Sequence, residues 1–367
     1  MRRSWLVIPL LVGLAAGCAV GPQAGPQSGP WVEPVPPDQQ ASEASGAPDG
    51  PPEITLAFGG DVHFVEYDGG VPNRTWRLLD DPDTAFGPVA ELLHDADLSM
   101  INLETAVTTG GTPEPKTFLF RAPPEAFDAV RAAGIDVVSL ANNHALDYGR
   151  DGLADTLAYA EAAGVAVVGA GEDADAAYAP WVVEVKGVRV AVLGFSQVWE
   201  LWEQWRATEQ RSGIAYAMDG DRALRAVRTA RQLADVVVVY MHWGQEGNPC
   251  PVPEMEDFAV AAARAGADIV VGTHAHLLLG DGWLGQTYVH YGLGNFLWWR
   301  DDRFSNDTGV LWITLQGDQV ESAELRPAVI SRQTGQPIPV TGEEADGVLR
   351  QVADLRECTN LADAPSH

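Results

Sequence analysis

The stretch DVVSLANNHALDYG, residues 136–149, decides the fold class predicted for this chain. It begins with the short apolar run 136–140, typical of a buried strand, and passes directly into a cluster of polar side chains. In α/β folds, binding and catalytic residues commonly lie in the loops at the carboxyl ends of strands. The stretch therefore predicts an α/β fold with functional residues at the strand ends.

Apolar runs of this kind alternate with alanine-rich helical stretches from residue 54 onward. The predicted strands are 54–58, 97–102, 136–140, 165–168, 188–195, 236–241, 269–272 and 288–291, followed by a hairpin of 309–315 and 319–325. The predicted helices are 86–95, 125–133, 151–163, 221–234 and 254–265. This alternation predicts α/β layers. Because no repeat or second linker is visible, we predict one domain over residues 53–357 and a C-terminal tail of 358–367.

The first residues are typical of an export signal. Arg2 and Arg3 precede the apolar stretch 5–14, and small residues then lead to Cys18. The sequence Leu-Ala-Ala-Gly-Cys resembles a bacterial lipobox, which implies that Cys18 is lipidated and becomes the new N-terminus. An ordinary secretory signal with a chance cysteine is the alternative. Residues 1–18 are too short to span a bilayer stably, so we expect an extracytoplasmic protein held at the cell membrane by a lipid.

Residues 19–52 are rich in proline, glycine, glutamine, serine and alanine. A segment of this composition cannot bury enough apolar surface to fold. We therefore predict a disordered tether between the lipid anchor and the domain.

The composition limits the classes of partner. The chain has 51 acidic and 23 basic residues and a formal charge of −28, which repels nucleic acid, so no nucleic-acid partner is expected. Three cysteines are too few for a disulfide scaffold. Cys250 and Cys358 could form a disulfide in an oxidising compartment, although their spacing does not prove it.

Five predicted strands end in side chains that commonly bind metals. In chain order these are Asp61 and His63, Glu104, Asn143 with His144, His242, and finally His274 with His276. A single histidine after a strand is usually an ordinary loop residue, but five such strand ends together favour a shared site. Imidazoles combined with carboxylates and an asparagine amide suit manganese, iron or zinc better than calcium or magnesium.

The order of these motifs resembles the calcineurin-like metallophosphoesterases. The strings NLETAVT, LANNHALDYG, MHWGQE, GTHAH and YGLGNF look like the poly-γ-glutamate capsule-synthesis (CapA-type) branch, and the resemblance covers roughly residues 54–300. It implies a metallophosphoesterase-like four-layer sandwich of two mixed β-sheets flanked by helices. It also implies two divalent metal ions in one site.

The resemblance assigns each candidate ligand to an ion. One ion is expected to bind Asp61, His63, Glu104 and His276, and the other Glu104, Asn143, His242 and His274. Glu104 would bridge the two ions, at a place where metallophosphoesterases usually have an aspartate.

Residues around the ligands are assigned supporting roles. His144 is expected to protonate the leaving group, with support of a neighbouring ligand as the alternative. Asp147 and Glu246 are expected to orient imidazoles. Arg121, in a Phe-Arg-x-Pro element of the family, is expected to bind an anionic substrate group, and a surface salt bridge is the alternative.

Three functions agree with these features. The first is metal-assisted hydrolysis in the synthesis or processing of poly-γ-glutamate or another envelope polymer, together with capsule-synthesis partner proteins. The second is a non-catalytic component that binds or exports a polymer and has a structural metal site. The third is a binding module that uses Trp199, Trp202 and Trp205, which would form one stripe on a helix and either pack on the domain or bind polymer.

Overall fold

The computed structural model describes residues 50–68, 70–300 and 305–366. Cys18, the rest of the predicted signal, and residues 19–49 of the predicted tether lie outside the described residues. Among the described residues, no helix is long and apolar enough to cross a membrane.

The first sheet has eight strands in the order β20-β19-β18-β1-β4-β7-β8, and β17 pairs with β1. Its parallel part consists of β1 (Glu53–Val62), β4 (Leu98–Leu103), β7 (Val137–Ser139), β8 (Ala166–Val168) and β17 (Asn295–Leu297). Its antiparallel part consists of β18 (Asp307–Gln316), β19 (Gln319–Ile330) and β20 (Pro337–Pro339). The sheet is therefore mixed.

The second sheet has six strands in the order β10-β11-β13-β14-β16-β15. They are β10 (Trp181–Val185), β11 (Val188–Ser196), β13 (Val236–His242), β14 (Ile269–Thr273), β15 (Asp281–Leu284) and β16 (Thr287–His290). The central strands β11, β13, β14 and β16 are parallel, whereas β10 and β15 are antiparallel to their neighbours. Parallel strands are normally covered on both faces, which explains their continuous apolar runs.

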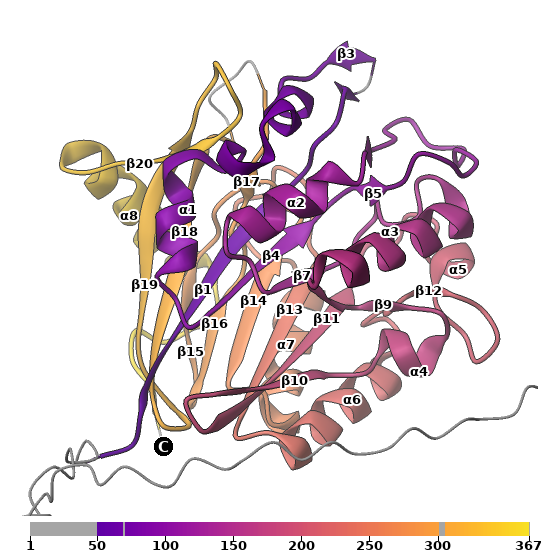
Figure 1. The fold of residues 1–367 in the computed structure, drawn as a ribbon. Helices are drawn as coiled ribbons and strands as arrows, with labels where there is room; N and C mark the ends of the chain where they lie inside the picture. Colours follow the sequence, from indigo (N-terminus) through magenta and orange to yellow (C-terminus); the bar gives the residue numbers. More distant parts are fainter. Residues whose placement is uncertain (1–49, 69, 301–304, 367) are drawn as a thin grey trace, which may run out of the picture. The chain divides into compact units, whose positions relative to one another are not determined.

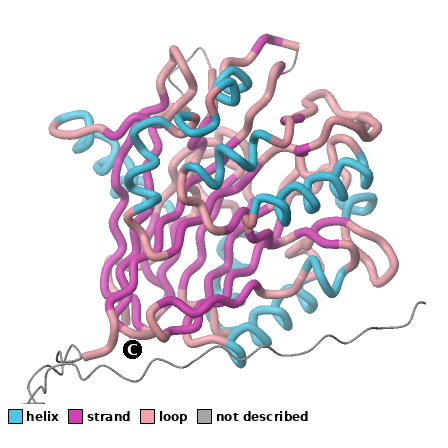
Figure 2. The backbone as a smooth tube through the Cα atoms, viewed as in Figure 1, coloured by secondary structure: helices cyan, strands magenta, loops and turns pink. Residues whose placement is uncertain are grey.

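The two sheets pack face to face, with helices on both outer faces (Figures 1 and 2). A shared core of residues such as Phe58, Met100, Val190 and Val238 lies between the sheets. On the first sheet lie α1 (Ala90–His94), α2 (Glu125–Ala132) and α3 (Gly149–Ala163). On the second lie α4 (Ala174–Ala177), α6 (Gly220–Leu233) and α7 (Pro253–Ala265). The predicted four-layer sandwich is confirmed.

Short elements decorate the sandwich. They are β2 (Tyr67–Asp68) with β3 (Val71–Pro72), β5 (Ala106–Val107) with β6 (Arg121–Ala122), β9 (Ala170–Gly171) with β12 (Gly213–Ile214), α5 (Trp202–Trp205), and the 3₁₀ helices η2 (Thr75–Asp80), η3 (Pro82–Thr84), η4 (Gly87–Val89) and η5 (Arg356–Cys358). The predicted helix 86–95 is divided between η4 and α1.

One long helix was not predicted. The helix α8 (Glu343–Leu355) places Val348 and Val352 against Leu278 and Leu325. Acidic residues and Gly347 obscure its apolar face in the sequence. The helix covers part of β19 and β15.

A disulfide joins Cys250 and Cys358, so the pairing considered from the sequence is present. Beyond it, the Asn360 side chain accepts a hydrogen bond of 2.8 Å from the Tyr291 hydroxyl, and Ala362 pairs with Trp283 of β15. The bridge closes a loop of 108 residues, which in the chain-entropy model stabilises the fold by about 5 kcal/mol.

Candidate metal centre

The predicted ligands meet at the carboxyl ends of the parallel strands. Asp61 ends β1 and Glu104 follows β4, both in the first sheet, whereas His242 ends β13 and His274 follows β14 in the second. Because the carboxyl ends of parallel strands lie at one edge of a sheet, two stacked sheets bring the four side chains together.

The close side chains form two groups that share one residue. In one group, potential ligand atoms of Glu104, His242 and His274 lie within 4.8 Å of one another. In the other, the same limit holds for Asp61, Glu104 and His276. Glu104 therefore lies where a carboxylate could bridge two cations.

Asn143 extends the first group. Its Oδ1 atom lies 2.8 Å from Nε2 of His242, and Oε1 of Glu104 lies 3.4 Å from the same nitrogen. On the other side of the ring, His242 Nδ1 lies 3.0 Å from the Thr273 hydroxyl, which donates to the Met241 carbonyl, and 3.2 Å from the Asn102 amide nitrogen. His242 Nε2 therefore faces Glu104 and Asn143, the position from which it could bind a metal ion together with them.

Buried polar atoms at this centre lack partners. Five of them have no hydrogen-bond partner within the described residues: both oxygens of Glu104, both ring nitrogens of His63, and Nδ1 of His274. Burial, and then the charge of Asp61, raise the pKa of Glu104 well above its ordinary range. A buried unpaired polar group costs about 1–3 kcal/mol, and a bound cation would remove that cost. The residues present therefore fit divalent cations.

The GTHAH loop has a strained backbone. His274 and His276 have φ angles of 86° and 57°, a left-handed conformation that costs of order 1–3 kcal/mol in residues other than glycine. The conformation lets the His274 amide donate to Asp61 Oδ2 at 3.1 Å and places His276 Nδ1 3.5 Å from the same oxygen. Burial lowers the pKa of His276, but the bond to Asp61 and the charge of Glu104 outweigh it and raise the pKa to about 9.

Comparisons with known proteins identify the family of this chain. Residues 55–298 match the model of the family described as bacterial capsule synthesis protein PGA_cap. The chain belongs to this family. Capsule biosynthesis protein CapA of Bacillus anthracis is 31% identical over 82% of this chain and 73% of that protein. PGA biosynthesis protein CapA of Bacillus subtilis is 29% identical over 83% of this chain and 78% of that protein. The solved NAD nucleotidase of Haemophilus influenzae has a TM-score of 0.44 and 13% identity, covering 85% of this chain and 64% of that one.

His63 lies beside the two close groups and belongs to neither. Its ring stacks on Trp298 at 3.7 Å between centroids and meets the edge of Phe120 at 4.9 Å. Burial, followed by the charges of His144 and His276, lowers its pKa well below the ordinary value. The ring is therefore neutral and held by aromatic packing, as is suitable for a metal ligand.

Two asparagines connect the loops that carry the ligands. The Asn102 amide donates to Asp61 Oδ1 at 2.8 Å, and its own oxygen accepts from Asn142 at 3.0 Å. The Asn142 oxygen in turn accepts from the backbone amide of His144 at 3.0 Å. These bonds fix the LANNH loop relative to β1 and β4, so that Asn143 and His144 have defined positions.

His144 forms a buried pair with Asp147. Its Nδ1 atom lies 2.6 Å from Asp147 Oδ2, and its ring stacks on Phe120 at 3.8 Å. The Phe120 amide donates to the same carboxylate oxygen at 2.6 Å. Burial raises the pKa of Asp147 to about 7, although Lys116 opposes the shift. The Asp147 carboxylate therefore lies where it could orient the His144 imidazole.

Lys116 is a site residue that the sequence analysis missed. Its side chain is 2% exposed, and its ammonium group donates to Asp147 Oδ1 at 2.7 Å and to the Asn143 carbonyl. It also pairs with Glu200 at 3.1 Å and lies 4.9 Å from the centroid of Trp205. The only signal was rarity, because the chain has two lysines, at positions 116 and 186.

The other two predicted residues are exposed. Arg121 is exposed, and its guanidinium lies 4.6 Å over the Tyr148 ring, next to Asp147 in sequence. Glu246 is exposed, and the amide of the following Gly247 donates to the Ala275 carbonyl at 2.9 Å, between the two GTHAH histidines. Glu246 is close enough for its charge to add to the effect of burial in raising the pKa of Glu104, whereas the Arg121 guanidinium contacts Tyr148.

The predicted tryptophan stripe is wrong. The helix α5 includes Trp202 and Trp205 but not Trp199, because Leu201 before it has a φ of 51° and breaks the helical path. Trp205 is buried, whereas Trp199 is 68% exposed and meets Trp202 edge to face at 5.9 Å. Trp205 therefore belongs to the packing around Lys116.

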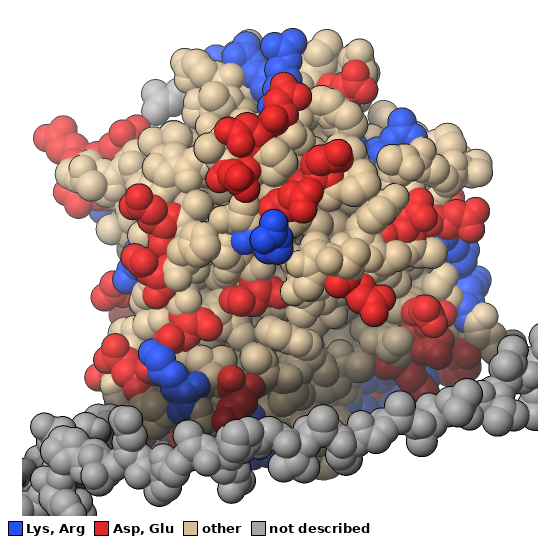
Figure 3. Space-filling view, in the orientation of Figure 1, with Lys and Arg blue, Asp and Glu red and all other residues tan. Residues whose placement is uncertain are grey.

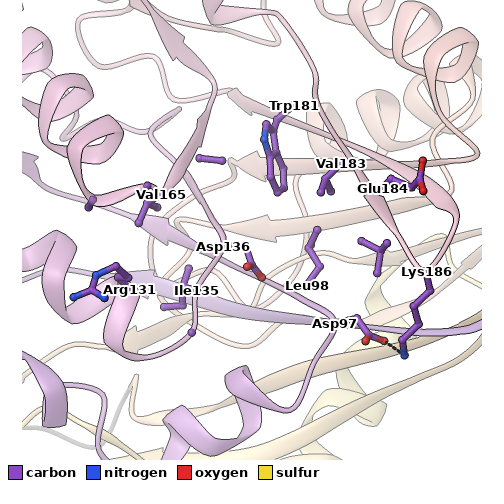
Figure 4. Close-up of a pocket in the computed structure, with 15 residues that line it drawn as sticks. Asp97, Leu98, Arg131, Ile135, Asp136, Val165, Trp181, Val183, Glu184 and Lys186 are labelled. Carbon is purple, nitrogen blue, oxygen red and sulfur yellow. Dashed lines mark hydrogen bonds and ion pairs between the residues drawn. The ribbon is translucent and has the colours of Figure 1, made fainter. Parts of the chain in front are cut away.

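A cavity of about 750 Å³ lies elsewhere, at the opposite ends of the strands (Figure 4). It is lined by residues that precede β4, β7 and β8, among them Asp97, Asp136 and Val165, and by Trp181 and Lys186 of the β10–β11 hairpin. Its charged groups include the pair of Asp97 and Lys186, at 2.7 Å. The cavity is therefore separate from the candidate metal centre.

Proposed function

We propose that this member of the capsule synthesis family is a metal-dependent hydrolase that acts on an envelope polymer outside the cytoplasm. The observation that carries the proposal is Glu104, a buried carboxylate without hydrogen bonds that is common to two groups of ligand-type side chains. Burying an unpaired carboxylate destabilises the metal-free fold, and bound cations would offset that free-energy cost.

Two divalent ions of manganese, iron or zinc would supply Lewis acidity and lower the pKa of a coordinated water. Asp61, His63, Glu104 and His276 would hold one ion, and Glu104, Asn143, His242 and His274 the other. The chain itself contributes the geometry, since the hydrogen bonds of Asn102 and Asn142 and the strained GTHAH backbone set the ligand positions before metal binds.

His144 would donate the proton that the leaving group needs. Asp147 holds the Nδ1 side of the ring at 2.6 Å, so the Nε2 side is left to meet the substrate. Lys116 neutralises Asp147 at 2.7 Å and fixes the Asn143 carbonyl, so it links the position of the acid to that of a ligand. The exposed Arg121 and Glu246 would contact the substrate and the imidazoles, respectively.

The polymer is assigned by analogy. Two relatives are named as capsule and PGA biosynthesis proteins. We therefore propose a poly-γ-glutamate or related envelope polymer as the substrate, with capsule-synthesis proteins as partners. Function does not follow from fold alone, so the bond that is cleaved must be tested directly.

The enzyme proposal is tested with purified protein, Mn²⁺, p-nitrophenyl phosphate and its diester analogue. We expect about two bound ions by elemental analysis and turnover that EDTA abolishes. Glu104→Gln should lose both, whereas Glu91→Gln, at an exposed position of α1, should lose neither. Metal binding without turnover of any ester would favour the non-catalytic polymer-binding alternative, and the absence of metal binding would refute both.

The lipid anchor is tested with Cys18→Ser. A lipid chain contributes about 0.8 kcal/mol per buried methylene, and the proposed tether has no other anchor. We expect the variant to move from the membrane fraction to the soluble extracytoplasmic fraction. Continued membrane fractionation would contradict lipidation at Cys18.

A further inference from the structure

A second cavity, of about 680 Å³, lies between η2 and the loop that joins β19 to β20. Its lining includes Arg74 and Arg77 from the η2 segment, Trp299 after β17, and Gln333 and Thr334 of the loop. A volume of this size accommodates several residues of an extended ligand, whereas a single small anion needs much less.

The charge of this cavity is opposite to that of the protein. The described residues that line it include two arginines and no aspartate or glutamate, in a chain with 51 acidic and 23 basic residues. Figure 3 shows a group of Lys and Arg side chains at the top of the face, with Asp and Glu side chains next to it and over much of the remaining face. An anionic chain that the rest of the surface repels would be attracted here.

The Arg74 side chain is held in position. The Arg74 guanidinium lies 4.9 Å from the Trp299 centroid and donates to the Gln333 carbonyl at 2.8 Å. The Trp299 indole is fixed by its bond to the Arg332 carbonyl at 2.7 Å. Arg77 follows Arg74 by three residues, and its backbone amide donates to the Arg74 carbonyl at 3.1 Å. Because residues three apart eclipse on a 3₁₀ turn, both guanidinium groups lie on one face of η2.

The cavity is connected to the candidate metal centre by one peptide bond and one hydrogen bond. Trp298, which stacks on His63 and lies 4.7 Å from His276 between ring centroids, is followed directly by Trp299 of the cavity wall. On the other side, the amide of Val65, two residues after His63, donates to the Thr75 hydroxyl of η2 at 3.3 Å. Residues that line the cavity are therefore directly connected to residues that contact the predicted ligands.

We propose that this cavity, which we call the arginine pocket (Arg74, Arg77 and Trp299), binds successive carboxylates of an anionic polymer next to the metal centre. The proposal deepens the proposed function, since it concerns the substrate of that same centre. Each guanidinium can bind a carboxylate through two parallel hydrogen bonds. Two such groups about 6 Å apart along η2, at a rise of about 2.0 Å per residue, fit a chain with repeated charges better than a lone anion.

The test measures binding of fluorescent poly-γ-glutamate to the full extracytoplasmic chain, with and without EDTA. Arg77→Gln should weaken binding about tenfold, because one charge-assisted hydrogen-bonded contact is lost. Arg77→Lys should restore only part of it, since lysine lacks the planar fork. Arg228→Gln, at an exposed position of α6, removes the same charge elsewhere and should leave binding unchanged.

EDTA separates this inference from the hydrolase proposal. Binding that persists in EDTA and falls in Arg77→Gln supports the pocket even if no turnover is found. Absence of wild-type binding, equal weakening by Arg228→Gln, or no effect of Arg77→Gln would overturn it. Inorganic polyphosphate is the second probe, and polyphosphate binding as tight as that of poly-γ-glutamate would overturn the carboxylate assignment.

Discussion

Four aspartates at the amino ends of the parallel strands are hydrogen-bonded to the backbone, whereas Glu104 at the carboxyl ends has no hydrogen bond among the described residues. At the amino ends, one aspartate precedes each of four strands and accepts a hydrogen bond from a backbone amide of the neighbouring strand. The pairs are Asp97 with Thr55 at 3.0 Å, Asp136 with Ser99 at 2.8 Å, Asp235 with Arg189 at 3.0 Å and Asp268 with Val237 at 2.7 Å. At the carboxyl ends, Glu104 is fully buried and neither of its oxygens is hydrogen-bonded among the described residues.

The difference separates structural acids from functional ones. The amino-end aspartates satisfy the sheet that they border, and the cavity of about 750 Å³ beside two of them needs no ligand to complete its bonds. The carboxyl-end groups carry the cost of unpaired burial and of left-handed histidines. These unfavourable free energies are tolerated where a bound group offsets them. In this protein, unsatisfied buried polar atoms therefore identify the candidate site better than cavity size does.

Glu104→Gln is expected to have the largest effect, because it removes the residue common to both ligand groups. Metal content should fall from about two ions toward none, and metal-dependent turnover should disappear. The amide is nearly isosteric and neutral, so the fold should survive. Elemental analysis with circular dichroism checks both points.

His276→Ala and His242→Ala sharpen this result, since each histidine belongs to a different group. Each variant should lower the metal content by about one ion. Unchanged metal content in Glu104→Gln or in both histidine variants would show that the carboxyl-end groups are not ligands.

His144→Ala should have the next largest effect, and on turnover alone. The proposed acid donates a proton without holding metal, so turnover should fall by about 10²–10⁴-fold while metal content is kept. The loss should shrink for leaving groups as acidic as p-nitrophenol, which need no proton to depart. Steady-state kinetics with activated and unactivated esters measure it, and a variant that loses its metal would make His144 a ligand instead.

The sequence predicted the strands and the candidate ligands for a common physical reason. Each ligand directly follows an apolar run, so Asp61, Glu104, Asn143 and His242 are marked by local pattern alone, and the topology of parallel strands brings them together. The resemblance then supplied what pattern could not, namely the role of Glu104 as the residue common to two groups.

Residues that lie in irregular segments near the two proposed sites follow no apolar run, so no local sequence pattern indicated them. Lys116 lies between β5 and β6, where no periodicity points to burial, and Arg74 meets Trp299 across 225 positions of sequence only because two loops converge. The prediction for Trp199 was wrong for the opposite reason: its spacing from Trp202 fits a helix, but the left-handed backbone of Leu201 interrupts the helix. Backbone conformation and loop approach are tertiary properties, and a single sequence does not reveal them.

Removal of metal should destabilise the protein through the carboxyl-end centre only. A ligand at 100 times its Kd stabilises a fold by about 2.7 kcal/mol, so EDTA should lower the Tm of the wild type by several degrees. Glu104→Gln, which would already lack metal, should show no further change with EDTA. Thermal unfolding followed by circular dichroism measures both proteins, and an equal EDTA effect in the two would place the relevant metal elsewhere.

Asp97→Asn should have the smallest effect on stability, and it tests whether the amino-end aspartates are only structural. The Asp97 carboxylate accepts bonds from the Thr55 amide and hydroxyl and from Lys186 at 2.7 Å, so its loss should cost about 1 kcal/mol without changing metal content. Burial opposes the shift, but the bond from Lys186 and those from Thr55 lower the pKa of Asp97 below its ordinary value. The charged form is therefore favoured by folding, and its contribution is present above about pH 4 and lost as the pH falls further. Urea unfolding at pH 7 and at lower pH should show the gap between wild type and variant narrowing with acid, and a gap that widens or a variant that loses metal would mean that the amino-end acids are not merely structural.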